Sequence, residues 1–171
     1  MRQYLTFELD GKAYGVGVEF VNSVLDPQDI TPLPRAATIV TGLTNVRGNV
    51  VPVFDPRGIL AQTLVDEDMV PQGQDVQEGL DVAESEDGGI IIFEIENGTL
   101  LPFIGLEADR IGKVILLEEG QLAAVPDFLP DAATRYFEGF CFVGGRRHSM
   151  LRLSALASRE SLFPQEGGRR A

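Results

Sequence analysis

This sequence is poor in the residues that enzymes and metal sites use most often. It has one histidine, His148, one cysteine, Cys141, and no tryptophan among its 171 residues. A catalytic triad or dyad would have to use His148, which stands beside Arg146 and Arg147. These cations oppose the imidazolium that a general base must form. One histidine and one cysteine also cannot build a structural zinc site. We therefore expect no catalytic centre, no metal and no cofactor.

A lone cysteine excludes an intramolecular disulfide. Cys141 lies between Phe140 and Phe142, apolar neighbours that predict an inert core thiol. This use of cysteine is typical of a reducing compartment. The sequence also lacks a basic segment followed by an apolar run, and it has no apolar stretch long enough to span a bilayer. The sequence therefore predicts a cytoplasmic protein with no direct membrane insertion.

Positive charge is scarce as well. The chain carries 14 lysines and arginines against 26 acidic residues, which gives a net charge of −12. Nine of the acids, and no base, fall within residues 64–89. This balance argues against binding to nucleic acid, which needs a basic surface, and against docking on an anionic membrane. Because residues 64–89 show no sustained apolar period, we expect a flexible solvated linker; a loop with no role of its own is the alternative.

What the chain does contain is an internal repeat. Three segments of the first half recur in the second: FELDGKAYGV from Phe7 and FEIENGTLLPF from Phe93, VEFVNSVL from Val18 and ADRIGKVILL from Ala108, GLTNVRGNVVPVFD from Gly42 and GFCFVGGRRHSMLRL from Gly139. Two copies of one pattern predict two similar β modules.

Short strands and tight turns dominate the local patterns. Apolar alternation across residues 5–9 predicts a strand, and Asp10-Gly11 predicts a hairpin turn. Further strands are expected over 14–16, 42–45, 50–54, 89–95, 100–106, 114–117, 136–143 and 148–153, with turns at 47–49, 97–98 and 144–145. The valines at 18, 21 and 24 have helical spacing and indicate a short helix or helical turn. Ser154 is expected to cap a short helix through Arg159. Such closely spaced strands favour small barrels over an open α/β sheet.

The segment GLTNVRGNVVPVFDPR, residues 42–57, resembles the signature of the CheW family, the coupling proteins of bacterial chemotaxis. Residues 7–42 are similar to the family's first strand, hairpin and valine-rich segment, and residues 89–156 match its second half more loosely. Three departures stand out. Pro56 replaces the usual leucine, and Ser23 stands where a charged partner of the motif arginine is common. The acidic linker is also longer than usual in the family.

The resemblance implies a mostly β fold with two intertwined five-stranded SH3-like β-barrel subdomains and short helical segments. We expect residues 1–63 to form the first barrel, 64–89 the acidic linker, 90–160 the second barrel and 161–171 a flexible tail. It also implies a non-catalytic adaptor for signal transduction. Such an adaptor joins the regulatory domain of a CheA-like histidine kinase to the cytoplasmic tip of methyl-accepting chemoreceptors.

Six residues follow from the resemblance as candidates for partner binding. Val18, Val21 and Val24 match the region that lines the receptor groove, although periodicity alone favours core packing; the resemblance favours the groove for Val21 at least. Arg47 matches a position near the kinase-facing and receptor-facing surface, and its turn would be held by the other two candidates, Asn45 and Gly48. No catalytic, cofactor-binding or metal-binding residue is implied.

Three other functions remain open at this point. The stretches 45–48 and 136–140 are also similar to adaptors of the type IV pilus (twitching) pathway. An enzyme with an unrecognised active site is a rival of a different class. A stand-alone SH3-like module for proline-rich ligands is a third, but its groove needs clustered surface aromatics, and this chain has no tryptophan and three tyrosines.

Overall fold

The computed structural model describes residues 1–33, 39–65, 73, 75–78, 85–95 and 102–162. Its strands are β1 (Arg2–Leu9), β2 (Lys12–Gly17), β3 (Val21–Leu25), β4 (Thr31–Pro32), β5 (Val40–Val46), β6 (Asn49–Phe54), β7 (Gln77–Glu78), β8 (Gly89–Glu94), β9 (Phe103–Ala108), β10 (Arg110–Leu117), β11 (Phe137–Val143) and β12 (Arg146–Leu151). The helical segments are the 3₁₀ turn η1 (Val18–Phe20) and the short helices α1 (Arg57–Ala61), α2 (Asp131–Tyr136), α3 (Leu153–Leu156) and α4 (Arg159–Leu162).

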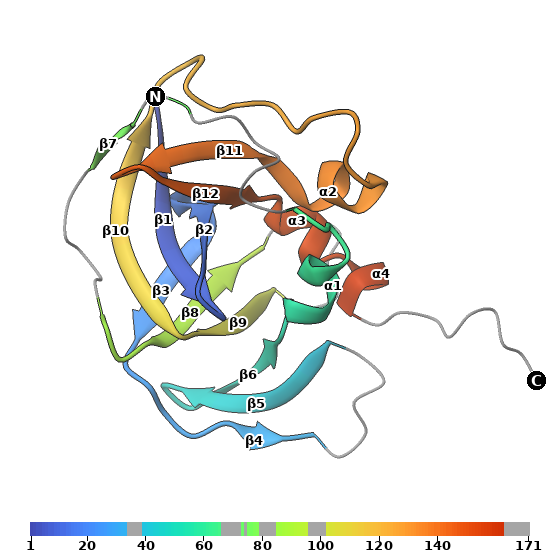
Figure 1. Ribbon diagram of the computed structural model, residues 1–171. Helices are drawn as coiled ribbons and strands as arrows, with labels where there is room; N and C mark the ends of the chain where they lie inside the picture. Colours follow the sequence, from blue (N-terminus) through green and yellow to red (C-terminus); the bar gives the residue numbers. More distant parts are fainter. Residues whose placement is uncertain (34–38, 66–72, 74, 79–84, 96–101, 163–171) are drawn as a thin grey trace, which may run out of the picture.

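The strands form two sheets. Sheet A has the order β11-β12-β2-β1-β10-β7, and sheet B has the order β3-β8-β9-β6-β5-β4. Each sheet contains five strands of five residues or more and one strand of two residues. The helices gather on one side of the molecule, at the right in Figure 1. The expected fold class, a mostly β chain with two β subdomains and short helices, is confirmed.

The internal repeat is visible in the topology. If the order of sheet B is reversed, β5-β6-β9-β8-β3 corresponds strand for strand to β11-β12-β2-β1-β10 of sheet A. Both sheets contain one parallel pair at the matching place, β6 with β9 and β12 with β2. The strand β3 pairs with β8, and β10 pairs with β1, across a register shift at the corresponding position. Two copies of one sequence pattern have therefore produced two copies of one sheet.

The two halves of the chain exchange strands, which corrects the expected domain boundaries. Sheet A combines β1 and β2 with β10 to β12, and sheet B combines β3 to β6 with β8 and β9. Residues 1–63 and 90–160 therefore do not each close a sheet of their own. The physical reason is that the hairpins β1–β2 and β8–β9 each pair with strands from the other half through long-range ladders.

Tight turns follow the expected chemistry. Asp10 and Gly11 have φ values of 52° and 78°, and Arg47 and Gly48 have values of 53° and 86°. Two successive positive φ values are typical of the turn whose twist matches a two-residue hairpin. Gly144 and Gly145, at 59° and 79°, close the last hairpin in the same way. The predicted turn at 97–98 lies outside the described residues.

Three local predictions need correction. The valine-rich segment is helical only over Val18–Phe20 and continues as strand β3, since β-branched side chains suit a strand better than a helix. Ser154 lies inside α3, whose N-cap is Arg152, so it is not the cap. The acidic linker is not wholly solvated, because Gln77–Glu78 forms β7 and Val76 is buried. Of the expected tail, residues 163–171 lie outside the described part of the chain.

Among the described residues, the core has three parts. The largest cluster draws side chains from both sheets and from the helices, including Phe7, Phe54 and Phe93. A smaller cluster belongs to sheet A and the acidic segment: Tyr4, Val76, Ile115, Leu117, Cys141 and Met150. Another belongs to sheet B: Val51, Ile90 and Ile92, with Leu25, Ile30 and Val46 packed against them. Each sheet therefore has apolar side chains on both faces, one against the shared core and one against its own small cluster.

Candidate partner-binding surface

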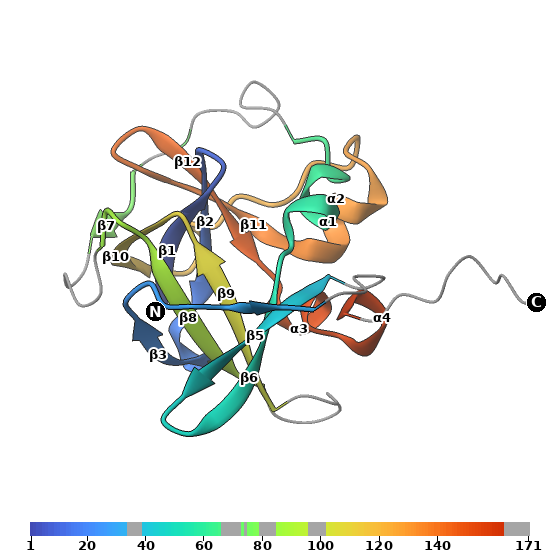
Figure 2. The same cartoon turned by 90° about the horizontal axis from the view of Figure 1, so that it is seen from below.

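The hairpin β5–β6 holds three of the candidate residues at its tip. Arg47 and Gly48 form the turn, and the Gly48 N–H donates to Asn45 Oδ1 at 2.9 Å. This bond fixes the turn from within, so the Arg47 side chain is left to solvent. Figure 2 shows the hairpin projecting away from the helices. The signature thus folds into a rigid tip that presents one guanidinium.

Beside this tip lies a groove of about 590 Å³, within the usual size range of ligand sites. The hairpin supplies one wall, and β3, β8 and the start of β9 supply the other; the lining residues are Asn22, Val46, Arg47, Asn49, Val50, Val51, Pro52, Ile92, Pro102 and Phe103. Its floor is buried at Val51 and Ile92, both members of the small cluster of sheet B. Its rim is open, because Val50 is 65% exposed and Phe103 is 37% exposed. An apolar floor below exposed apolar side chains and one cation suits a protein partner better than a polar small molecule.

The structure separates the six candidates into two groups. Asn45, Arg47 and Gly48 are together at the hairpin tip, and Arg47 lines the groove. Val18, Val21 and Val24 are half-buried and pack against the large core cluster. The neighbouring Asn22, which is exposed, reaches the groove instead. Each of the three valines therefore packs partly against the core, and part of its surface stays accessible.

Sequence reasoning missed the apolar rim of the groove. Val50 belongs to an apolar run that looked like an ordinary strand, and Phe103 follows Pro102 at the start of β9. The sequence did contain a signal, because an apolar side chain directly beside a hairpin turn lies too far from the core to be buried in it. The β9 wall could not be found from sequence, because β6 and β9 are far apart in the chain and pair in parallel.

The end of the signature has a structural role. Arg57 lies at the start of α1, with its Nη1 3.3 Å from Asp55 Oδ1 and its Nη2 3.0 Å from Asp109 Oδ1. Its Nε is 3.1 Å from Asp10 Oδ2, in an ion pair without hydrogen-bond geometry. Asp10 follows β1 of sheet A, whereas Asp55 follows β6 of sheet B. Partial burial lowers the pKa of Arg57, but the three carboxylates outweigh it and raise that pKa above its ordinary value. This cluster, the Arg57 clamp, joins the two sheets.

A second ionic contact links two strands of sheet A, β1 and β11, to the 3₁₀ turn η1. Arg2 Nη2 is 2.6 Å from Glu19 in η1, and its Nη1 is 3.3 Å from Glu138 in β11. The Tyr4 hydroxyl donates to the same Glu138 carboxylate at 3.0 Å. Burial and the negative charge of Glu138 raise the pKa of Tyr4 well above its usual range. The phenol therefore stays protonated and keeps donating this bond at any physiological pH.

The two side chains that could support chemistry, Cys141 and His148, are both buried and pack inside the protein. Cys141 is buried, and burial raises the pKa of its thiol to about 12. His148 is also buried, with Nδ1 3.1 Å from the Arg146 carbonyl oxygen, and burial lowers its pKa. A nucleophile needs a low thiol pKa, so Cys141 has the wrong environment for one.

Within the described part of the chain, no group of three or more histidine, cysteine or acidic side chains is arranged to hold a metal ion. No helix there is long and apolar enough to cross a membrane.

Comparison with known proteins places this architecture in a family. The model of the CheW-like domain matches residues 3–161. The chain is 24% identical over 161 residues to the chemotaxis protein CheW of Klebsiella aerogenes, covering 94% of this chain and 84% of that protein. It is 24% identical over 137 residues to the chemotaxis protein CheW of Treponema pallidum, covering 80% and 71%.

Solved structures agree with this assignment at the level of the fold. The crystal structure of the scaffolding protein TtCheW from Thermoanaerobacter tengcongensis superposes with a TM-score of 0.65 at 22% identity, covering 94% of this chain and 91% of that one. The family match spans nearly all of the described strands, including both sheets and the hairpin that carries Arg47. This chain belongs to the family of CheW-like domain proteins.

Proposed function

We propose that this protein is a non-catalytic adaptor of chemotaxis-like signal transduction, which couples chemoreceptors to a CheA-type histidine kinase. The observation that carries the proposal is the family match over residues 3–161 together with an open apolar groove beside the signature hairpin. Receptor tips and kinases of this kind work in the cytoplasm, and the proposal places the adaptor there with them.

The groove is the proposed kinase-docking surface. Val50 and Phe103 supply exposed apolar area beside a buried floor, the arrangement expected of an interface centre. Arg47 stands at its rim, where an acidic or carbonyl group of the partner would meet it. Because the hairpin is already ordered by the Asn45–Gly48 bond, docking requires little rearrangement of this side.

The proposed receptor-docking region is the segment of η1 and β3 that holds Val18, Val21 and Val24. These side chains are half-buried, so each offers some apolar surface while its remainder packs on the core. A helical receptor tip binds through apolar side chains at regular spacing. The two partners would then lie on adjacent surfaces, because Asn22 of β3 also lines the groove.

Titration calorimetry with the isolated regulatory domain of the cognate kinase tests the first assignment. Val50→Glu places a charge at the groove rim without burying it, and we expect affinity to fall at least tenfold. Phe128→Glu is the matched control, because Phe128 is 71% exposed and does not line the groove. The control should bind like the wild type. Equal affinities for wild type and Val50→Glu would remove the groove from the kinase interface.

A further inference from the structure

The two repeated sheets differ at both edges: sheet B carries β4 beside β5, and sheet A carries β7 beside β10. In sheet A, β7 pairs antiparallel with the outer edge of β10, through Glu78 with Ile115 and Gln77 with Leu116. In sheet B, the place of β10 is taken by β3, and no described strand lies on its outer edge. Figure 1 shows β7 outside β10, apart from the other strands. The segment that carries β7 is therefore an addition to the five-strand unit and not one of its members.

This added segment contacts sheet A at three more points. The Val76 N–H donates to the Phe142 carbonyl at 2.8 Å, and the Gly145 N–H donates to Asp75 Oδ1 at 2.9 Å. Ser85 exchanges two backbone hydrogen bonds with Ile111, of 2.8 and 2.9 Å. We name the described residues 75–78 and 85–88 the acidic strap. It spans from the β11–β12 hairpin to both ends of β10.

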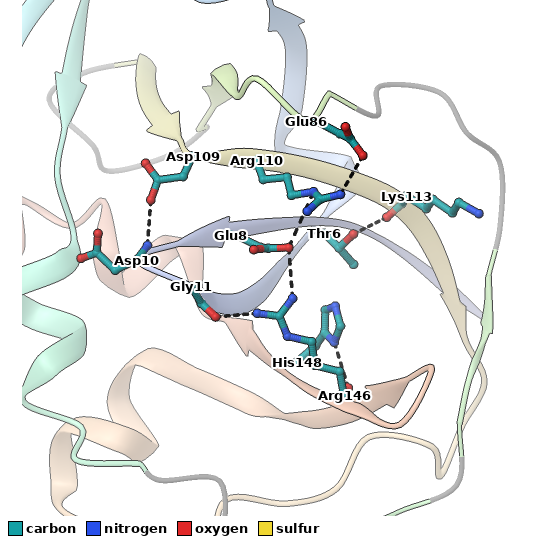
Figure 3. Close-up of polar contacts among 10 residues, drawn as sticks. All are labelled: Thr6, Glu8, Asp10, Gly11, Glu86, Asp109, Arg110, Lys113, Arg146 and His148. Carbon is teal, nitrogen blue, oxygen red and sulfur yellow. Dashed lines mark hydrogen bonds and ion pairs between the residues drawn. The ribbon is translucent and has the colours of Figure 1, made fainter.

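An ion pair and one apolar side chain complete the contacts of the strap. Figure 3 shows Glu86 paired with Arg110. The Glu86 Oε1 atom lies 3.0 Å from Arg110 Nη2 in this solvent-exposed pair. Val76 is 6% exposed and belongs to the small cluster of sheet A, together with Ile115 and Cys141. In sheet B the corresponding small cluster forms the floor of the open groove. The strap thus covers the small cluster of sheet A, whereas the small cluster of sheet B is left accessible at the floor of the groove.

The described residues of the strap are held mainly by backbone hydrogen bonds, with little buried apolar surface. Its ladder to β10 has two residue pairs, its described apolar anchor is one valine, and its ion pair is screened by water. The surrounding segment 64–89 carries nine acids and no base, so its charges repel one another. Segments with few buried contacts open locally at a much lower free energy than the whole fold.

We propose that the outer edge of β10, with the small cluster beside it, is a second docking surface that the acidic strap occupies in competition with a partner. The strap itself shows what fits there: an extended chain that runs antiparallel to β10 at Ile115 and Leu116. Such a ligand places a small apolar side chain where Val76 lies and a carboxylate opposite Arg110. Its mode of binding is strand addition to a sheet edge.

The single cysteine provides a native reporter of strap opening. Cys141 is 1% exposed and shares the cluster with Val76, so a thiol reagent reaches it only when the cluster opens. Val76→Ser removes the apolar anchor, and we expect Cys141 to react at least tenfold faster in low denaturant. Val51→Ser is the matched control, since Val51 is 4% exposed in the small cluster of sheet B. It should leave the labelling rate within about threefold of the wild type.

Denaturant separates strap opening from global unfolding. Labelling through strap opening should depend weakly on urea, because little surface is exposed, whereas labelling through unfolding follows the global slope. If both serine variants accelerate labelling equally and with the global slope, the strap does not open as a unit and the proposal is wrong.

A peptide in trans tests the docking surface itself. A synthetic peptide of residues 73–88 added to the Val76→Ser protein should occupy the vacated edge and slow Cys141 labelling in a saturable manner. The same peptide carrying Val76→Asp should give no protection. No protection by either peptide, in a protein whose strap has opened, would contradict the assignment of a strand-binding surface.

Discussion

The Arg57 clamp predicts a measurable coupling between the two sheets. Arg57→Ala removes one cation that contacts Asp10, Asp55 and Asp109, and it leaves three carboxylates near one another. Arg57→Lys keeps the charge, but a single ammonium cannot reproduce the fork that reaches three partners. The alanine variant should therefore be the less stable of the two, and both should be less stable than the wild type.

The size of the effect follows from exposure. The four side chains are between 33% and 67% exposed, so each pair is treated as a screened surface pair of about 0.2–1 kcal/mol. Three pairs in one network give a loss of about 1–2 kcal/mol, part of which is the repulsion between the remaining carboxylates. For a chain of this length, this corresponds to a fall in Tm of about 2–8 °C.

Urea unfolding at low and at high salt measures this loss. The loss for Arg57→Ala should shrink in high salt, because screening weakens exposed pairs. Arg135→Ala is the control: Arg135 is an exposed arginine on α2, and its removal should cost less than about 0.5 kcal/mol. If Arg57→Ala costs no more than the control at low salt, the clamp does not stabilise the contact between the sheets.

Three further outcomes are expected. Burial lowers the pKa of His148, so the unfolded state binds a proton at a higher pH than the folded state does. As the pH falls below about 6.5, the wild type should therefore lose stability, and His148→Gln should lose less, as judged by urea midpoints. Gly48→Ala should cost about 1–2 kcal/mol in thermal melts, because Gly48 has a φ of 86°. Val21→Ser should cost about 1 kcal/mol, less than the roughly 1.5–3 kcal/mol of a fully buried valine, and a larger fall in Tm would make Val21 a core residue only.

Local chemistry allowed much of the fold to be predicted from sequence. The turns at Asp10-Gly11 and Gly144-Gly145 were predicted because positive φ values leave few residue choices. The repeat predicted two equal units, and the strand order of the two sheets confirms it. These signals are short in range, which is why a single sequence contains them.

The pairing of strands that are far apart in the chain could not be predicted from the sequence. No local pattern indicates that β1 pairs with β10, or that β8 pairs with β3, because the sequence of a strand does not identify its antiparallel partner. The division at the acidic segment was wrong for this reason. Hydrophobic alternation shows that a strand has a buried face, but it does not show which strand covers it.

Only part of the candidate site, the hairpin tip, could be predicted from the sequence. The hairpin tip with Asn45, Arg47 and Gly48 came from a contiguous motif, and its turn geometry agrees with the expectation. The groove needed a wall from β9, which no contiguous motif could reveal. The binding roles of the six candidates stay predictions, and the variants above test Val21 and Gly48 for stability only.

Reconstitution of receptor-controlled kinase activity tests the central claim most directly. Receptor-containing membranes and the cognate CheA-type kinase would be assayed for kinase autophosphorylation with no adaptor, with the wild type and with Val50→Glu. We predict that the wild-type protein makes kinase activity respond to the receptor ligand and that Val50→Glu loses this effect, while Phe128→Glu retains it. Kinase activity that is the same with and without the wild-type protein, at every ligand concentration, would contradict the assignment as a coupling adaptor.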